Sequence, residues 1–149
     1  MIRLALAGAL AAIALVQPAE AKGFLSLTTR DAGRMIAWYR TNFDLRVMRT
    51  VRPDGMNLTV TILDGPLATV EILARPDARP ADPQPQSRIG FFKAGFAVDD
   101  LDPWLARWQA AGVVFANPPF DDDQPPLREV ILADPDGNRI QIIAPIPGR

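Results

Sequence analysis

The spacing of apolar and polar residues predicts the same succession of elements twice along the chain. Apolar residues recur at intervals of three and four from Ala32 to Phe43, which is typical of an amphipathic helix with one buried face. A second stripe runs from Leu101 to Trp108, where Asp102 is predicted to cap the helix and Pro103 takes its first position. Alternating or β-branched runs, which favour strands, occupy residues 24–29, 45–52, 57–63, 69–73, 91–98, 113–116, 127–132 and 139–143.

The two halves correspond to one another at an offset of 69–70 residues. Tyr39 aligns with Trp108, and Val70-Glu71-Ile72 aligns with Ile140-Gln141-Ile142. Such a repeat indicates two copies of one supersecondary unit. We therefore predict an α+β fold in which two repeated βαβββ modules form a curved mixed sheet with helices on its outer face. The expected boundaries of this single domain (22–149) are module 1 at 24–74, a proline-rich linker at 75–90 and module 2 at 91–144.

Side chains alternate between the two faces of a strand, so the pattern also predicts what lies opposite the helices. That face is expected to be a trough that binds a ligand. Apolar walls are expected from Phe24, Leu73 and Ile143, and oriented polar groups from Glu71, Lys93 and Gln141. Three interpretations of Lys93 stay open: an ion pair with Glu71, a cation that binds an anionic or carbonyl ligand, or a catalytic amine.

Two other clusters favour structural interpretations. Tyr39, Trp104 and Trp108 fall at helical spacing, which indicates core packing and not a stacking platform. Residues 117–126 are rich in Pro and Asp and are predicted to be a loop. The run Asp121-Asp122-Asp123 inside it lacks the alternating spacing of a calcium loop, so a solvated acidic loop is expected.

The first 21 residues have the order of a secretory signal peptide. A short positive start is followed by the apolar run Leu4–Val16, and Ala19-Glu20-Ala21 has the form of a cleavage site. The apolar run has 13 residues and is too short to span a bilayer. We expect a periplasmic or secreted mature protein that starts at Lys22 and has no membrane partner after cleavage.

Composition removes several classes of function. The formal net charge is −1, which gives no case for nucleic acid as a partner. The chain contains no Cys and no His, so thiol nucleophiles, thiolate metal sites and imidazole bases are excluded. The predicted core must hold the fold without disulfides.

The chain resembles the vicinal oxygen chelate superfamily, which includes glyoxalase I, extradiol dioxygenases and bleomycin-resistance proteins. The stretch Leu132–Ile142, with its Asp-Pro-Asp-Gly-Asn turn, and the junction Phe96–Leu101 followed by Ala110–Val114 carry this resemblance. The resemblance implies a divalent metal in the trough, with ligands at the positions of Phe24, Glu71, Lys93 and Gln141. Phe24 has no donor atom, Lys93 is cationic and Gln141 is a weak ligand, so no metal and no cofactor are expected.

These observations favour a metal-independent protein that binds a small organic molecule in the trough, as the bleomycin-resistance branch does. One alternative is a glyoxalase-like lyase or isomerase with a degenerate metal site, in which Glu71 acts as base and Lys93 stabilises an enolate. Another is a structural dimerisation module with a closed trough. A homodimer is compatible with each, because the family builds its trough within one chain or across two.

Overall fold

The computed structural model describes residues 22–80 and 89–148, so the predicted signal peptide at 1–21 lies outside the described residues. The first module contains β1 (Gly23–Thr29), α2 (Ala32–Phe43), β2 (Arg46–Val51), β3 (Thr59–Asp64) and β4 (Ala68–Ala74). The second contains β5 (Ala94–Ala97), α3 (Asp102–Ala110), β6 (Phe115–Asp123), β7 (Pro126–Ala133) and β8 (Arg139–Pro145). None of the helices in these ranges is long and apolar enough to cross a membrane.

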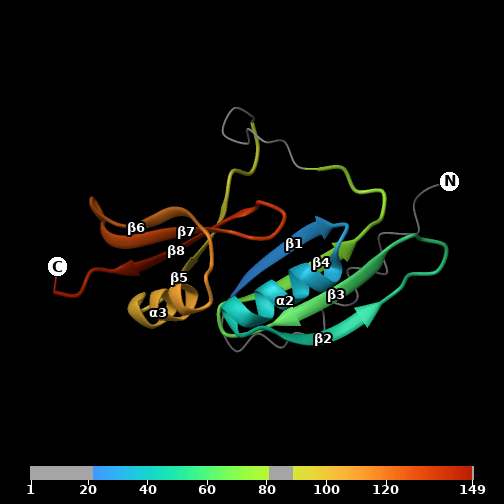
Figure 1. Ribbon diagram of the computed structural model, residues 1–149, viewed down its shortest axis with the longest axis horizontal. Coiled ribbons are helices and arrows are strands. Elements are labelled where there is room, and N and C mark those ends of the chain that lie inside the picture. The colour runs from blue at the N-terminus through green and yellow to red at the C-terminus, as the bar shows by residue number, and fades with distance from the viewer. Residues whose placement is uncertain (1–21, 81–88, 149) are drawn as a thin grey trace.

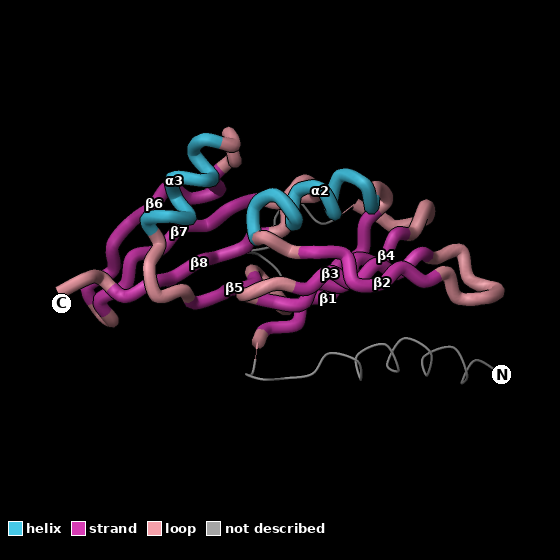
Figure 2. Tube along the Cα trace, turned by 90° about the horizontal axis from the view of Figure 1, so that it is seen from below, coloured by secondary structure: helices cyan, strands magenta, loops and turns pink. Residues whose placement is uncertain are grey.

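Each module forms its own four-stranded mixed sheet. The strand orders are β1-β4-β3-β2 and β5-β8-β7-β6, with β1 parallel to β4, β5 parallel to β8 and the other neighbours antiparallel. The helix in each unit returns the chain so that the first strand pairs with the last, which accounts for the parallel pair. Both helices lie on the same side of the sheets (Figure 2). The predicted α+β fold of two βαβββ modules is therefore confirmed.

The two modules lie side by side with β1 and β5 innermost (Figure 1). A Cβ placed on Gly23 of β1 would come within 3.0 Å of the Phe96 ring of β5, so these strands approach closely. The helices complete the contact through an aromatic cluster. Phe43 at the end of α2 lies 5.8 Å from Trp108 and 6.3 Å from Trp104 between ring centroids. The core of the molecule is therefore continuous across both modules.

The helical aromatic residues pack in this core, as the spacing predicted. Tyr39 and Trp108 are 1% and 0% exposed, and Trp104 is half-buried against the same cluster. Polar contacts also join the modules. They are the hydrogen bonds from Tyr39 to Asp134 and from Trp108 to the Asn42 carbonyl, and the ion pairs Arg34–Asp136 and Arg107–Asp44. We refer to these four contacts and the aromatic cluster as the module interface.

The prediction of a loop at 117–126 is wrong, because most of this segment belongs to β6. Asp121 and Asp122 pair in register with Arg128 and Leu127 of β7, so the acidic run is part of a hairpin. The sequence argued for a loop because Pro118 and Pro119 cannot donate to a sheet ladder. β6 lies at the edge of its sheet, and both prolines fall within a register shift, so the strand accommodates them.

The predicted cap of the second helix is also shifted by one position. Leu101 occupies the cap position, and Asp102 is the first helical residue. The backbone N–H of Asp102 donates to the carboxylate of Asp100 at 3.0 Å. An acidic side chain therefore satisfies this donor as expected, but it comes from two residues earlier.

Candidate functional site

The trough was predicted on the surface of both sheets that faces away from α2 and α3, and we call this surface the open face. In β1, Leu25 and Leu27 pack toward the core, whereas Phe24, Ser26 and Thr28 are exposed. In β8, Ile140 and Ile142 are buried, and Gln141 and Ile143 alternate with them. The open face is therefore defined by strand alternation in each module.

The six predicted site residues divide evenly between the two modules. The β1–β4 register pairs Ser26 with Glu71 and Thr28 with Leu73, which places Glu71 and Leu73 beside the exposed residues of β1. The first sheet therefore brings together Phe24, Glu71 and Leu73. The β5–β8 register pairs Gly95 with Gln141 and Ala97 with Ile143. The second sheet therefore carries Gln141 and Ile143, whereas Lys93 lies just outside it, immediately before β5, and is exposed.

The carboxylate of Glu71 has a partner on its own sheet. Ser26 Oγ donates to Glu71 Oε2 at 2.7 Å, and Glu71 is only 8% exposed. Among the ion pairs of the described residues, none joins Glu71 to Lys93. The predicted Lys93–Glu71 pair is therefore not formed within one chain. Strand alternation can place two residues on one surface, but it does not fix the distance between two sheets.

The second module has an equivalent polar pair that the sequence reasoning missed. Gln141, which corresponds to Glu71 in the repeat, donates through Nε2 to Oε2 of Glu129 on β7. Glu129 precedes the buried Val130, so alternation puts it on the open face. Val130 and Leu132 alternate as fully buried residues of β7, and this spacing could have indicated from the sequence that Glu129 faces the other way.

An ion pair anchors the start of β1 at the border of the open face. Lys22 Nζ lies 2.6 Å from Asp64 Oδ1, and Thr69 Oγ1 donates to the same oxygen at 2.6 Å. Burial alone would raise the pKa of Asp64, but the hydrogen bonds from Lys22 and Thr69 hold that pKa below its ordinary value. Asp64 therefore stays ionised and keeps Lys22 against the sheet.

The repeated modules and their open faces define a fold of the vicinal oxygen chelate class. The family model described as "Glyoxalase/Bleomycin resistance protein/Dioxygenase superfamily" matches residues 21–142, so the chain belongs to this superfamily.

Several solved structures share the fold. One is a glyoxylase/bleomycin resistance protein/dioxygenase domain from Frankia sp. EAN1pec, with a TM-score of 0.71 at 20% identity over 87% of this chain and 95% of that chain. TioX from Micromonospora sp. ML1 has a TM-score of 0.61 at 20% identity over 85% of this chain and 100% of that chain. A glyoxalase I mutant from Zea mays has a TM-score of 0.66 at 21% identity over 85% of this chain and 47% of that chain. The search of curated proteins gave no match. At such identities the likeness shows the fold alone.

The residues present do not fit the metal that the family resemblance implies. Of the four corresponding positions, Phe24 offers no donor atom and Lys93 offers a positive charge. The two oxygen donors, Glu71 and Gln141, are each bonded to a neighbour on their own sheet. Within residues 22–80 and 89–148, no three His, Cys, Asp or Glu side chains gather into a group that could hold a metal ion. This donor set does not suit a stable transition-metal site.

We expect the purified protein to contain no stoichiometric Zn, Ni, Mn or Fe by elemental analysis. The reason is that sites for these metals are built mainly from His, Cys, Asp and Glu ligands, and of the four positions only Glu71 is one of these. A variant that carries Phe24→His, Lys93→His and Gln141→Glu restores the donor types and should take up about one Zn²⁺ or Ni²⁺ per site. About one metal equivalent per chain in the unmodified protein would contradict the prediction. Failure of the restored variant to bind metal would show that the four positions do not converge.

Proposed function

We propose that this protein is an exported, metal-independent member of the superfamily that binds a small organic molecule in a trough lined by the open faces. The proposal depends on which chemical groups occupy the four positions that correspond to metal ligands in the family. Phe24 presents an aromatic ring that is 47% exposed, and Lys93 presents an exposed cation. Glu71 and Gln141 are held by Ser26 and Glu129. These groups suit the recognition of an organic ligand better than the coordination of a metal.

The polar groups of the proposed trough are oriented before any ligand arrives. The Ser26–Glu71 and Gln141–Glu129 pairs fix the side chains of β4 and β8 on their sheets. Phe24, Leu73 and Ile143 supply apolar surface between these pairs. A mostly apolar lining with a few fixed polar groups is the usual composition of a small-molecule site. Sequestration requires only this affinity, so the proposal needs no chemical step.

We propose further that a second copy of the chain closes the trough. Both open faces look to the side away from the helices, and the modules lie side by side in a single layer (Figure 2). Large apolar side chains remain exposed on this face, including Phe24 at 47% and Phe120 at 42%. Native mass spectrometry of the mature protein tests the assembly, because it reports the number of chains and any retained ligand together. A monomer that binds the ligand as tightly as the full assembly would refute closure by a second copy.

The Lys93→Met variant should keep its fold and lose affinity for anionic ligands. Methionine preserves the length of the side chain, and Lys93 is exposed, so the main change is the loss of the charge. With the anionic fluorophore anilinonaphthalene sulfonate as probe, we expect binding to weaken roughly tenfold, which is typical for loss of a charged hydrogen bond. Fluorescence titration measures this change.

Arg40→Met is the matched control, because Arg40 is an exposed cation of α2 on the helix side of the sheets. Its affinity for the probe should equal that of the unmodified protein. Equal losses in both variants would show that the probe responds to net charge and not to the open face.

We propose export on the pattern of residues 1–21. Expression in a bacterial host with its own signal machinery should yield a periplasmic protein whose sequence begins at Lys22. Intact mass and N-terminal sequencing of the periplasmic and cytoplasmic fractions measure this result. An exclusively cytoplasmic pool would count against export, and an intact Met1 in the periplasm would count against cleavage.

A further inference from the structure

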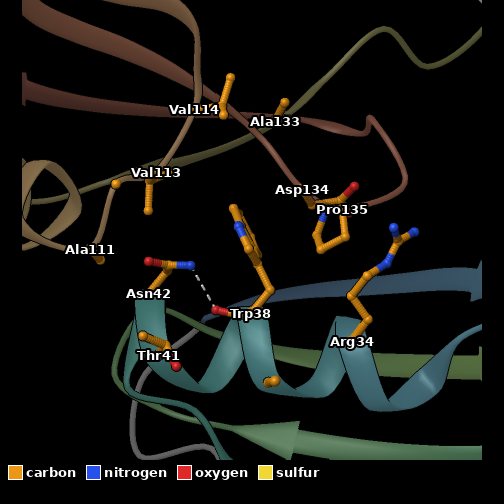
Figure 3. A pocket seen from close by; sticks show the side chains of 12 residues that line it. Arg34, Trp38, Thr41, Asn42, Ala111, Val113, Val114, Ala133, Asp134 and Pro135 are labelled. Atoms are coloured by element: carbon orange, nitrogen blue, oxygen red, sulfur yellow. Dashed lines mark hydrogen bonds between the residues drawn. The ribbon is translucent and has the colours of Figure 1, made fainter.

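A groove lies on the helix side of the molecule, away from the open face and between the two modules. Its volume is about 660 Å³, which is within the range of small-molecule sites. One wall is the side of α2 that faces the second module, with Arg34, Trp38 and Asn42. The other wall comes from residues 111–114, which follow α3, and from 133–135 at the end of β7 (Figure 3). Neither module could form this groove alone.

The groove contains a buried acceptor without a partner. Asn42 is 3% exposed, and its Nδ2 donates to the Trp38 carbonyl at 2.9 Å. Among the described residues, Oδ1 of Asn42 is the buried side-chain atom that has no hydrogen-bond partner. Figure 3 shows this oxygen at the far end of the amide from Trp38, on the side of Ala111 and Val113. Because an unpaired buried acceptor is costly, a bound donor at this position would be favourable.

The backbone groups nearest to this end of the groove cannot supply that donor. The N–H groups of Ala111, Gly112 and Val113 already donate to carbonyls of α3. These backbone groups therefore leave Oδ1 of Asn42 unpaired beside the groove.

The remaining surface of the groove is mostly apolar, apart from Thr41 and two charged side chains that are already paired. The half-buried indole of Trp38 faces residues such as Val113 and Pro135. The guanidinium of Arg34 forms an ion pair with Asp136, in which Nη2 lies 2.5 Å from Oδ1. The carboxylate of Asp134 accepts from Tyr39, from the Asn138 side chain and from two backbone N–H groups. An ionic ligand would find no uncompensated charge here.

We propose that this groove binds a small, neutral, planar molecule with one N–H or O–H donor. Its ring packs against Trp38, and its donor supplies the missing partner of Asn42 Oδ1. This site is distinct from the trough, because its lining contains none of the six residues predicted for the trough.

Indole and benzofuran form a matched pair of probes for this site. They have the same shape, but benzofuran carries an oxygen where indole carries an N–H. Titration of ¹⁵N-labelled mature protein should show saturable shifts of the Asn42 side-chain amide and of the Trp38 indole N–H. Indole should bind roughly fivefold more tightly than benzofuran, as expected for one hydrogen bond to a buried acceptor.

Two variants separate a specific site from a structural effect. Asn42→Leu removes the acceptor and should make the two probes bind equally. Val114→Trp fills the groove from a residue that is 70% exposed, so it should abolish binding of indole without unfolding the protein. Arg40→Met is the control, because Arg40 is exposed and does not line the groove, and it should bind indole normally.

The proposal is overturned by any of three results. The first is the absence of saturable shifts at the solubility limit of indole. The second is shifts centred on Ser26, Glu71 or Gln141, which would place the probe on the open face. The third is equal affinity for indole and benzofuran in the unmodified protein, which would mean that water already satisfies Asn42.

Discussion

The Asp134→Ala variant is expected to lose about 3–5 kcal/mol of unfolding free energy, because one buried carboxylate satisfies four donors. These are the hydroxyl of Tyr39, the side-chain amide of Asn138 and the backbone N–H groups of Asp136 and Asn138. Burial of Tyr39 and the negative charge of Asp134 hold the pKa of the phenol far above its ordinary value, so the hydroxyl keeps its proton and remains a donor. Urea unfolding followed by tryptophan fluorescence measures the loss.

Tyr39→Phe is the matched control for this prediction. It removes one of the four donors and should cost only about 0.5–1.5 kcal/mol. In the Asp134→Ala background the same change should be neutral or stabilising, because it removes an unpaired buried hydroxyl. A loss below about 1 kcal/mol in Asp134→Ala would show that the carboxylate does not hold the turn.

The contribution of Asp134 should also depend on pH in a defined direction. Burial raises the pKa of Asp134, and the hydrogen bonds from Asn138 and Tyr39 only partly oppose this effect. A carboxyl with a raised pKa binds its proton more tightly in the folded chain than in the unfolded chain. Its titration therefore favours the fold in acid, and that contribution is lost as the pH rises through the raised pKa. We therefore expect the difference in unfolding free energy between the unmodified protein and Asp134→Asn to fall as the pH rises from the ordinary pKa of an aspartate to the raised pKa of Asp134.

The Trp108→Ala variant should lose about 3–5 kcal/mol, which is typical for deletion of a fully buried indole. Trp108 is 0% exposed, its ring lies 5.8 Å from Phe43 and 5.7 Å from Trp104, and its Nε1 donates to the Asn42 carbonyl at 3.0 Å. Loss of near-ultraviolet circular dichroism and a lower urea midpoint would report the change.

Trp104→Ala provides the comparison, because Trp104 is half-buried and stacks with Arg107 at the surface. Its cost should be clearly smaller than that of Trp108→Ala. Equal costs would show that the cavity at the module interface collapses when Trp108 is removed.

Much of the fold was predictable because the hydrophobic pattern repeats. Alternation in β4 and β8 and the helical spacing from Ala32 to Phe43 depend on neighbours in sequence, and the structure has these elements within one or two residues. The edge strand β6 was not predicted, because it contains Pro118 and Pro119. A strand tolerates these prolines only when it lies at the edge of a sheet. That position is set by the tertiary fold and leaves no local signal.

For the candidate site, the sequence predicted which face of a strand a residue occupies, but not which residues of the two sheets contact one another. Alternation correctly assigned Glu71 and Gln141 to the face opposite the helices, but it could not pair residues from different sheets. A direct Lys93–Glu71 ion pair is not formed within one chain, and Glu71 and Gln141 instead bond to Ser26 and Glu129 on their own sheets. Asn42 gave no signal at all, because a polar residue near a helix end is ordinary and its missing partner is visible only in three dimensions.

The position of Phe43 at the end of α2 has a consequence for how this repeated sequence can change. A duplicated unit can normally diverge freely, since each half needs to satisfy only its own packing. Here a helix from one half contributes Phe43 and Tyr39 to contacts with residues of the other half. A substitution that changes the size of Phe43 or the hydroxyl of Tyr39 therefore has to be accommodated by Trp108 or Asp134 of the other module.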